Sequence, residues 1–333
     1  MLKSTKIILI TASALLVGGL GITGAAYAFS GFDPHIFTLR SKSAESYERK
    51  TAAVEQDFRN IKVDCKTEDI KFLPSPDGKI SVEYSGCDKL KHNVNVNGDV
   101  LTITAEDDRS FPNFFVFNVS LGNETSDKIY KPVYVYLPDG KEYGDISVRF
   151  STGDIENGTK LVSDSMTVFT TTGDIELRDL ESKTLDIGAN TGDIKLENIK
   201  ADTIKTTLTT GDTTIRNAET GKADFGTVTG EINLSSFGKG DLSIKYTTGS
   251  VDLKDVEAKT AIISGTTGDI ELDGFKADDC VIDLTTGCVS GSVIGDYQYT
   301  TKINTGDIEV PGSAGEAKMQ ITVKTGDIEI SKR

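Results

Sequence analysis

Hydrophobic and polar positions alternate along the C-terminal half of the chain, in units that repeat. Ten Thr-Gly pairs recur at intervals of 19 or 20 residues. Their glycines are Gly153, Gly173, Gly192, Gly211, Gly230, Gly249, Gly268, Gly287, Gly306 and Gly326. Apolar residues follow two and four positions after most of these glycines, as Ile175 and Leu177 do after Gly173. A period of two predicts a strand with one buried face.

A second apolar alternation lies further along each unit. Pairs such as Leu185/Ile187 and Leu242/Ile244 come twelve and fourteen residues after the glycine. Frequent β-branched residues and a recurring glycine oppose a helix. Two short strands per unit predict an all-β fold, a parallel β-solenoid with coils of ~19 residues stacked about 4.8 Å apart. We expect right-handed winding, because parallel crossovers are strongly right-handed.

The part of the chain before these repeats lacks the period. Six short strands are expected there: Ile61–Val63, Ile80–Tyr84, Val94–Val96, Val100–Thr104, Phe114–Val119 and Val133–Leu137. A solenoid needs atypical terminal units, so residues 58–150 are predicted to form irregular first coils and an N-terminal cap, and residues 151–333 the regular solenoid. Polar residues 29–57 are interpreted as a stalk or linker, with a short helix over Ala44–Gln56 as an alternative.

The N-terminal residues 1–28 predict export. Lys3 and Lys6 precede an apolar run, Ile7–Ala26, which is long enough to span a bilayer as a helix. The same segment ends in Ala26-Tyr27-Ala28, which matches a signal-peptide cleavage site. Both a cleaved signal and an uncleaved transmembrane anchor remain open. They predict a secreted protein and a membrane-anchored protein with an extracytoplasmic domain, respectively.

Charge and composition narrow the classes of function. The net charge is −15, from 36 Lys and Arg against 51 Asp and Glu. Such a chain repels nucleic acids and anionic membrane surfaces. Its only histidines, His35 and His92, disfavour histidine-based catalysis. A cell-surface or envelope protein or a glycan is the expected partner. The last strand, Ile328–Ile330, has no evident cap, so end-to-end self-association or cover by a partner is expected there.

An acidic residue follows most of the repeat glycines and would form a ladder along the stacked coils. Its aspartates are Asp154, Asp174, Asp193, Asp212, Asp269, Asp307 and Asp327. Carboxylates about 4.8 Å apart repel by about 3–4 kcal/mol at an effective dielectric constant of 20. Two interpretations remain open: hydrogen bonds from each aspartate to its own turn, and binding of Ca²⁺, the only cofactor that this pattern suggests. General acid–base catalysis needs one carboxyl pair set apart by its environment, so the repeated acids favour a structure without catalytic residues.

Four cysteines raise the question of disulfides, which export permits. Cys65 and Cys87 flank an expected strand pair, and a bridge between them is predicted. Cys280 holds an inward position, whereas Cys288 replaces an outward aspartate, so a Cys280–Cys288 bridge is less favoured than the first. Free thiols are the alternative. No C-x-x-C spacing indicates zinc binding or redox chemistry.

The order of these segments is distinctive. An apolar N-terminus is followed by Phe58-Arg59-Asn60-Ile61-Lys62-Val63, then Val133-Tyr134-Val135-Tyr136-Leu137-Pro138, then serial Thr-Gly-Asp-Ile-Glu-Leu units. Over residues 58–330 this resembles the bacterial putative-adhesin family, exported, adhesin-like β-solenoid proteins of undefined activity. The resemblance implies a non-enzymatic adhesin-like or envelope scaffold protein. An accessory regulator contacting a membrane envelope-stress sensor and a polysaccharide-active β-helix enzyme are the alternatives.

Overall fold

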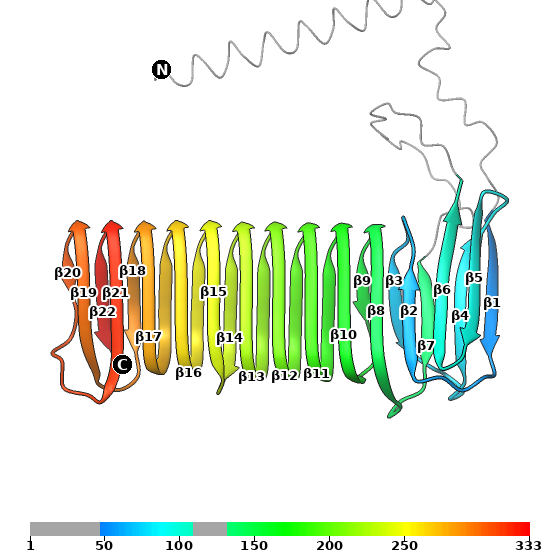
Figure 1. Ribbon diagram of the computed structural model, residues 1–333, viewed down its shortest axis with the longest axis horizontal. Coiled ribbons are helices and arrows are strands. Elements are labelled where there is room, and N and C mark those ends of the chain that lie inside the picture. Colours follow the sequence, from blue (N-terminus) through cyan, green and yellow to red (C-terminus); the bar gives the residue numbers. More distant parts are fainter. Residues whose placement is uncertain (1–46, 109–131) are drawn as a thin grey trace, which may run out of the picture. The chain divides into compact units, whose positions relative to one another are not determined.

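The computed structural model describes residues 47–108 and 132–333, and all regular structure in them is β (Figure 1). Parallel coils stack side by side along one axis, which confirms the predicted solenoid. The central strands are β8 (Glu142–Thr152), β9 (Ile155–Asn157), β10 (Leu161–Thr172), β11 (Ile175–Thr191), β12 (Ile194–Thr210), β13 (Thr213–Thr229), β14 (Ile232–Gly238), β15 (Asp241–Thr248), β16 (Val251–Thr267) and β17 (Ile270–Thr286).

Adjacent coils are in register, residue for residue. Ile175 in β11 pairs with Ile194 in β12, and Leu177 pairs with Leu196. Buried side chains therefore stack on the equivalent side chains of the next coil, which gives continuous aliphatic columns inside the solenoid. Burial of about 25 cal/mol per Å² of apolar surface makes these columns the main stabilising term.

Two kinds of corner turn each coil. At the Thr-Gly-Asp corner Gly211 has a φ of 131°, and a Cβ atom there would lie 2.1 Å from the carbonyl oxygen of Gly192. Only glycine fits, because the neighbouring coil leaves no room for a side chain. A second corner is formed by residues with left-handed backbone, for example Asn198 with a φ of 57° and Asn217 with a φ of 54°. Asn and Asp tolerate this conformation better than other residues with side chains.

Antiparallel strands close the N-terminal end. The first coil consists of β2 (Asn60–Asp64) and β3 (Ile70–Pro74), which lie between β8/β9 and the later strands β6 (Val100–Asp107) and β7 (Val133–Leu137). Three further strands, β1 (Glu48–Val54), β4 (Ile80–Gly86) and β5 (Leu90–Asn97), add antiparallel pairs β1–β4, β4–β7 and β5–β6. At this end β4 and β5 thus run opposite to the coil strands beside them, whereas β1 runs in the same direction as β7.

The N-terminal part of the structure differs from the sequence prediction before residue 58. Residues 48–54, placed in the stalk or in a helix over Ala44–Gln56, form strand β1 instead, because they pair with β4 over its whole length. The expected strand Phe114–Val119 and the signal or anchor segment 1–28 lie outside the described residues. Within the described part of the chain, no helix is long and apolar enough to cross a membrane.

At the C-terminal end the coils are not stacked in chain order. The strands are β18 (Val289–Val293), β19 (Tyr297–Thr305), β20 (Ile308–Glu309), β21 (Ala317–Thr325) and β22 (Ile328–Lys332). Strand β21 lies between β17 and β19, and β22 lies between β18 and β20 (Figure 1). The expectation that Ile328–Ile330 is an open edge is therefore wrong. Among the described strands, β19 and β20 form that edge, where Ile308 is 43% exposed.

Candidate functional site

The aspartates after the repeat glycines bind the backbone of the neighbouring coil. The Oδ1 atom of Asp174 accepts a hydrogen bond of 2.8 Å from the backbone N–H of Asp193. Equivalent bonds, 2.8–3.0 Å long, run to the acceptors Asp69, Asp154, Asp193, Asp212, Asp269 and Asp327. Asp307, in the outermost coil, donates its N–H to Asp327. We call this row, from Asp69 to Asp307, the aspartate column.

This geometry favours a structural role for the aspartate column. Each bond satisfies the backbone N–H that follows the glycine of the corner, and carboxylate acceptors make strong hydrogen bonds. The partner is the next coil, whereas the sequence suggested the aspartate's own turn. Across residues 47–108 and 132–333, no cluster of three or more His, Cys, Asp or Glu side chains is arranged to hold a metal ion. Binding of Ca²⁺ to this column stays an untested prediction.

Neither predicted disulfide is formed in the structure. Cys65 is a buried thiol after β2, and Cys280 is a buried thiol in a core column of β17. Cys288 occupies an aspartate-column position, where its N–H donates to Asp269. Its side chain and that of Cys280 thus belong to different columns. Burial raises the pKa of Cys280 to about 12, so this thiol stays protonated and unreactive.

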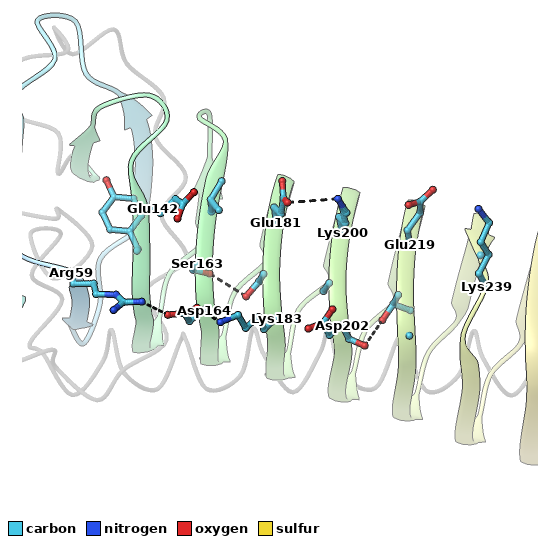
Figure 2. A pocket seen from close by; sticks show the side chains of 17 residues that line it. Arg59, Glu142, Ser163, Asp164, Glu181, Lys183, Lys200, Asp202, Glu219 and Lys239 are labelled. Carbon is cyan, nitrogen blue, oxygen red and sulfur yellow. Dashed lines mark hydrogen bonds and ion pairs between the residues drawn. The ribbon is translucent and has the colours of Figure 1, made fainter.

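A groove of about 690 Å³ crosses several coils of the described surface (Figure 2). We call it the charged groove. It is lined by Arg59, Glu142, Tyr143, Val162, Ser163, Asp164, Glu181, Ser182, Lys183, Lys200, Ala201, Asp202, Glu219, Thr220, Gly221, Gly238 and Lys239. Because these residues come from successive coils β8 to β14 and from Arg59 in front of β2, the groove runs along the solenoid axis.

Two rows of charged side chains border the charged groove. One row includes Glu181, Lys200 and Glu219, each 19 residues after the last, and the other includes Asp164, Lys183 and Asp202 (Figure 2). The sign of the charge alternates along both rows. The two rows also carry opposite signs within a single strand. Glu181 and Lys183 both belong to β11, and Lys200 and Asp202 both belong to β12.

Ion pairs hold the central carboxylates in their charged form. Asp164 contacts Lys183 Nζ at 2.7 Å and Arg59 Nη2 at 2.6 Å. Lys183 first, and Arg59 second, lowers the pKa of Asp164. The pKa of Glu181 is likewise lowered, chiefly by Lys160 at 3.2 Å and then by Lys200 at 3.7 Å. Neither carboxyl group is therefore suited to donate a proton near neutral pH.

Small residues form the floor of the charged groove. Ser163, Ser182, Ala201 and Thr220 stand at equivalent positions of consecutive coils and are almost buried. The Ser163 hydroxyl donates to Ser182 Oγ at 3.1 Å, and Ser182 donates to the carbonyl of Thr184 at 3.0 Å. Larger side chains would fill the groove, so its depth follows from the size of these residues.

Tyr143 at the N-terminal end of the charged groove has an unusual environment. The residue is only 3% exposed, and its hydroxyl has no hydrogen-bond partner among the described residues. Its ring stacks on Phe58, with 6.3 Å between the ring centres, and Lys141 Nζ lies 4.6 Å from the centre of the Phe58 ring. Burial raises the pKa of Tyr143, which keeps the hydroxyl protonated and able to donate.

Reasoning from the sequence did not find the charged groove. Consecutive residues in each row of the groove differ in the sign of their charge, so they form no repeated motif. The rows become visible only when the coils are aligned by the 19-residue period. Arg59 joins from 105 residues away in the chain. A signal existed in the small residues Ser182 and Ala201 at one position of the repeat, where the neighbouring inward positions carry Leu or Ile.

Fold and groove together define an extended parallel β-solenoid with a polar surface groove. The chain belongs to the Toastrack DUF4097 family, whose model matches residues 58–247 and residues 236–333. This confirms the family resemblance expected from the sequence. A comparison with curated proteins found no match.

Solved structures of low sequence identity resemble the chain over most of its length. One, from Bacteroides fragilis, is described as a "putative adhesin"; it is 14% identical, covers 85% of this chain and 97% of its own, and has a TM-score of 0.35. A second "putative adhesin", from Parabacteroides distasonis, is 14% identical, covers 86% and 98%, and has a TM-score of 0.36. A protein of the same species described as a "putative lipid binding protein" is 14% identical, covers 86% and 97%, and has a TM-score of 0.34.

Proposed function

We propose that this protein is an exported, non-enzymatic, adhesin-like or scaffold solenoid of the cell envelope, and that the charged groove is its binding surface. Export is supported by the basic and apolar residues 1–28. The size of the groove, about 690 Å³, falls within the range of ligand sites. Its length across successive coils suits an extended polymer better than a small molecule.

The state of the groove carboxylates carries the proposal. Hydrolysis of a glycosidic bond usually needs one carboxylic acid with a raised pKa and one carboxylate of a different environment. In the charged groove Asp164 and Glu181 are both ion-paired, and the pKa of each is lowered. Such groups accept hydrogen bonds from a bound chain and do not supply the proton that cleavage requires.

The test is a binding experiment with an enzymatic readout. The purified protein is incubated with a panel of envelope and host-surface polymers, and both retention and new reducing ends are measured. Retention without new ends is the expected result. New ends that disappear in Asp164→Asn would overturn the non-enzymatic assignment. Loss of retention in Lys200→Glu, but not in Lys205→Glu, is expected, because both lysines are exposed in β12 and only Lys200 lines the groove.

A further inference from the structure

The charge pattern of the groove restricts the chemistry of its ligand. Its lining holds four cations and five carboxylates, distributed so that both signs occur along both rows. A polyanion would meet carboxylates along the groove, for example Glu181 beside Lys183 and Asp202 beside Lys200, and a polycation would meet the lysines. Like charges brought together cost free energy and select against such partners. The complementary chain has no formal charge and many hydrogen-bonding groups.

The floor of the groove points to the same chemistry. Ser163, Ser182 and Thr220 offer hydroxyl groups, and the floor position of β10 to β13 carries only these residues and Ala201. The aromatic ring of Tyr143 stands at the same position in β8. An acyl chain would gain little apolar contact there and would desolvate the charged rows, which is costly. A polar chain replaces the water around these rows with hydrogen bonds of its own.

The Tyr143 hydroxyl lies buried at one end of the groove, without a hydrogen-bond partner among the described residues. A buried polar group without a partner is less stable than one that is hydrogen-bonded. The stack on Phe58 fixes the ring, and the raised pKa keeps the proton on the oxygen. The hydroxyl oxygen is itself buried beside one end of the groove, so it becomes available to a ligand oxygen only when the adjacent rim of the groove moves.

We propose that the charged groove binds an uncharged, hydroxyl-rich chain, a neutral polysaccharide, laid along the solenoid axis. Sugar hydroxyls donate to the groove carboxylates and accept from its lysines, so they suit β11 and β12, where both signs of charge line the groove. The Tyr143 hydroxyl donates to an oxygen of one sugar unit and fixes the position of the chain. This inference rests on the proposed function and specifies its ligand.

The experiment compares affinities for neutral, acidic and basic polysaccharides. Dextran, laminarin and a galactomannan serve as neutral probes, polygalacturonate as the acidic probe and chitosan as the basic one. We expect the full-length protein to bind at least one neutral probe, with an affinity that changes little between about 0.05 and 0.5 M salt, because an uncharged ligand is not screened. Preference for a charged probe, with affinity that falls steeply with salt, would overturn the inference.

Substitutions locate the bound chain. Tyr143→Phe removes only the hydroxyl and is expected to weaken binding of the neutral probe about tenfold, the effect of one lost hydrogen bond. Tyr134→Phe in β7, outside the groove, is the matched control and should bind as the parent does. The thermal stability of Tyr143→Phe should not fall, because the hydroxyl has no partner to lose in the free protein. Unchanged binding in Tyr143→Phe would overturn the role of this residue.

The outcomes separate this inference from the function on which it rests. Retention of a charged or protein polymer that is lost in Lys200→Glu would leave the groove as the binding surface and refute the neutral ligand. Binding of a neutral probe that survives both Lys200→Glu and Tyr143→Phe would refute the groove as the site. No retention of any polymer by the folded protein would refute both.

Discussion

Two lengthwise features of the solenoid, the aspartate column and the charged groove, carry charged residues in successive coils, yet they differ in what those residues contact. In the column, Asp174 and its equivalents repeat one hydrogen bond to the next coil. In the groove, Glu181, Lys200 and Glu219 change sign from coil to coil and border an open surface. The column contact recurs in most coils and is interrupted at Glu231, Ser250 and Cys288. Nearly uniform chemistry thus accompanies a contact between coils, and varied chemistry accompanies an open surface.

The largest contrast is expected from adding a methyl group to a glycine of each feature. Gly211→Ala at the Thr-Gly-Asp corner places Cβ 2.1 Å from a backbone oxygen at a φ of 131°. We expect a loss of about 3 kcal/mol or more in the free energy of unfolding, since backbone strain and a rigid clash combine. Chemical denaturation of the purified variant measures this loss.

Gly221→Ala in the charged groove is the matched control. Its Cβ would lie 3.2 Å from the carbonyl oxygen of Asp202, without a positive φ. A small shift relieves this contact, so the loss should stay below about 1 kcal/mol. Equal losses at Gly211 and Gly221 would contradict the view that only the Thr-Gly-Asp corner is sterically closed.

A smaller contrast is expected from the carboxylates. Asp193→Ala removes the acceptor of the Asp212 N–H and should cost about 1–2 kcal/mol of stability. Asp193→Asn keeps an acceptor oxygen and removes a charge from a row of like charges, so it should cost much less. Asp202→Ala in the groove, where the side chain is exposed, should change stability by less than about 0.5 kcal/mol. If the Asn and Ala variants at position 193 melt alike, the acceptor is not what stabilises the corner.

The smallest expected effect is a pH dependence within the groove. Lys183 and Arg59 lower the folded-state pKa of Asp164, so this group contributes stability above its unfolded pKa and loses that contribution as pH falls through the lowered folded pKa. The melting temperature of the parent should therefore exceed that of Asp164→Asn at about pH 7, and the difference should shrink towards about pH 3. A difference that is constant across this range would exclude the ion pairs as its origin. Surface exposure of the pairs keeps the effect small.

Much of the fold could be predicted from the sequence because the solenoid repeats. The spacing of Thr-Gly pairs fixed the coil length, and the alternation at Ile175 and Leu177 fixed which side chains point inward. The end regions could not be predicted in this way. Strand β1 falls in a polar segment without a period. The positions of β19 and β21 are interchangeable by sequence, because Thr305 and Thr325 are equivalent members of one repeat.

The candidate site was harder to predict than the fold. Sequence reasoning selected the aspartates, whose regularity made them conspicuous, and the structure places them in backbone hydrogen bonds. The residues of the charged groove differ in type from coil to coil, so no sequence pattern groups them. They come together only when the strands pair in register, as Asp164 and Lys183 do when β10 pairs with β11. Arg59 and Tyr143 line the groove at its N-terminal end. Neither residue belongs to the 19-residue pattern, so the sequence gives no sign of their place there.

The interleaved order of β17, β21 and β19 has a consequence for how the solenoid frays. The outermost coil, β19 and β20, is tethered at both of its ends, through residues 294–296 to β18 and through residues 310–316 to β21. When it detaches it forms a closed loop rather than a loose tail. A short loop keeps its ends at high effective concentration and returns quickly to its place. A force that pulls on β22 must break its pairing with β18 and β20 together, because β22 lies between them. The order of the coils therefore raises the resistance of this end to mechanical unfolding.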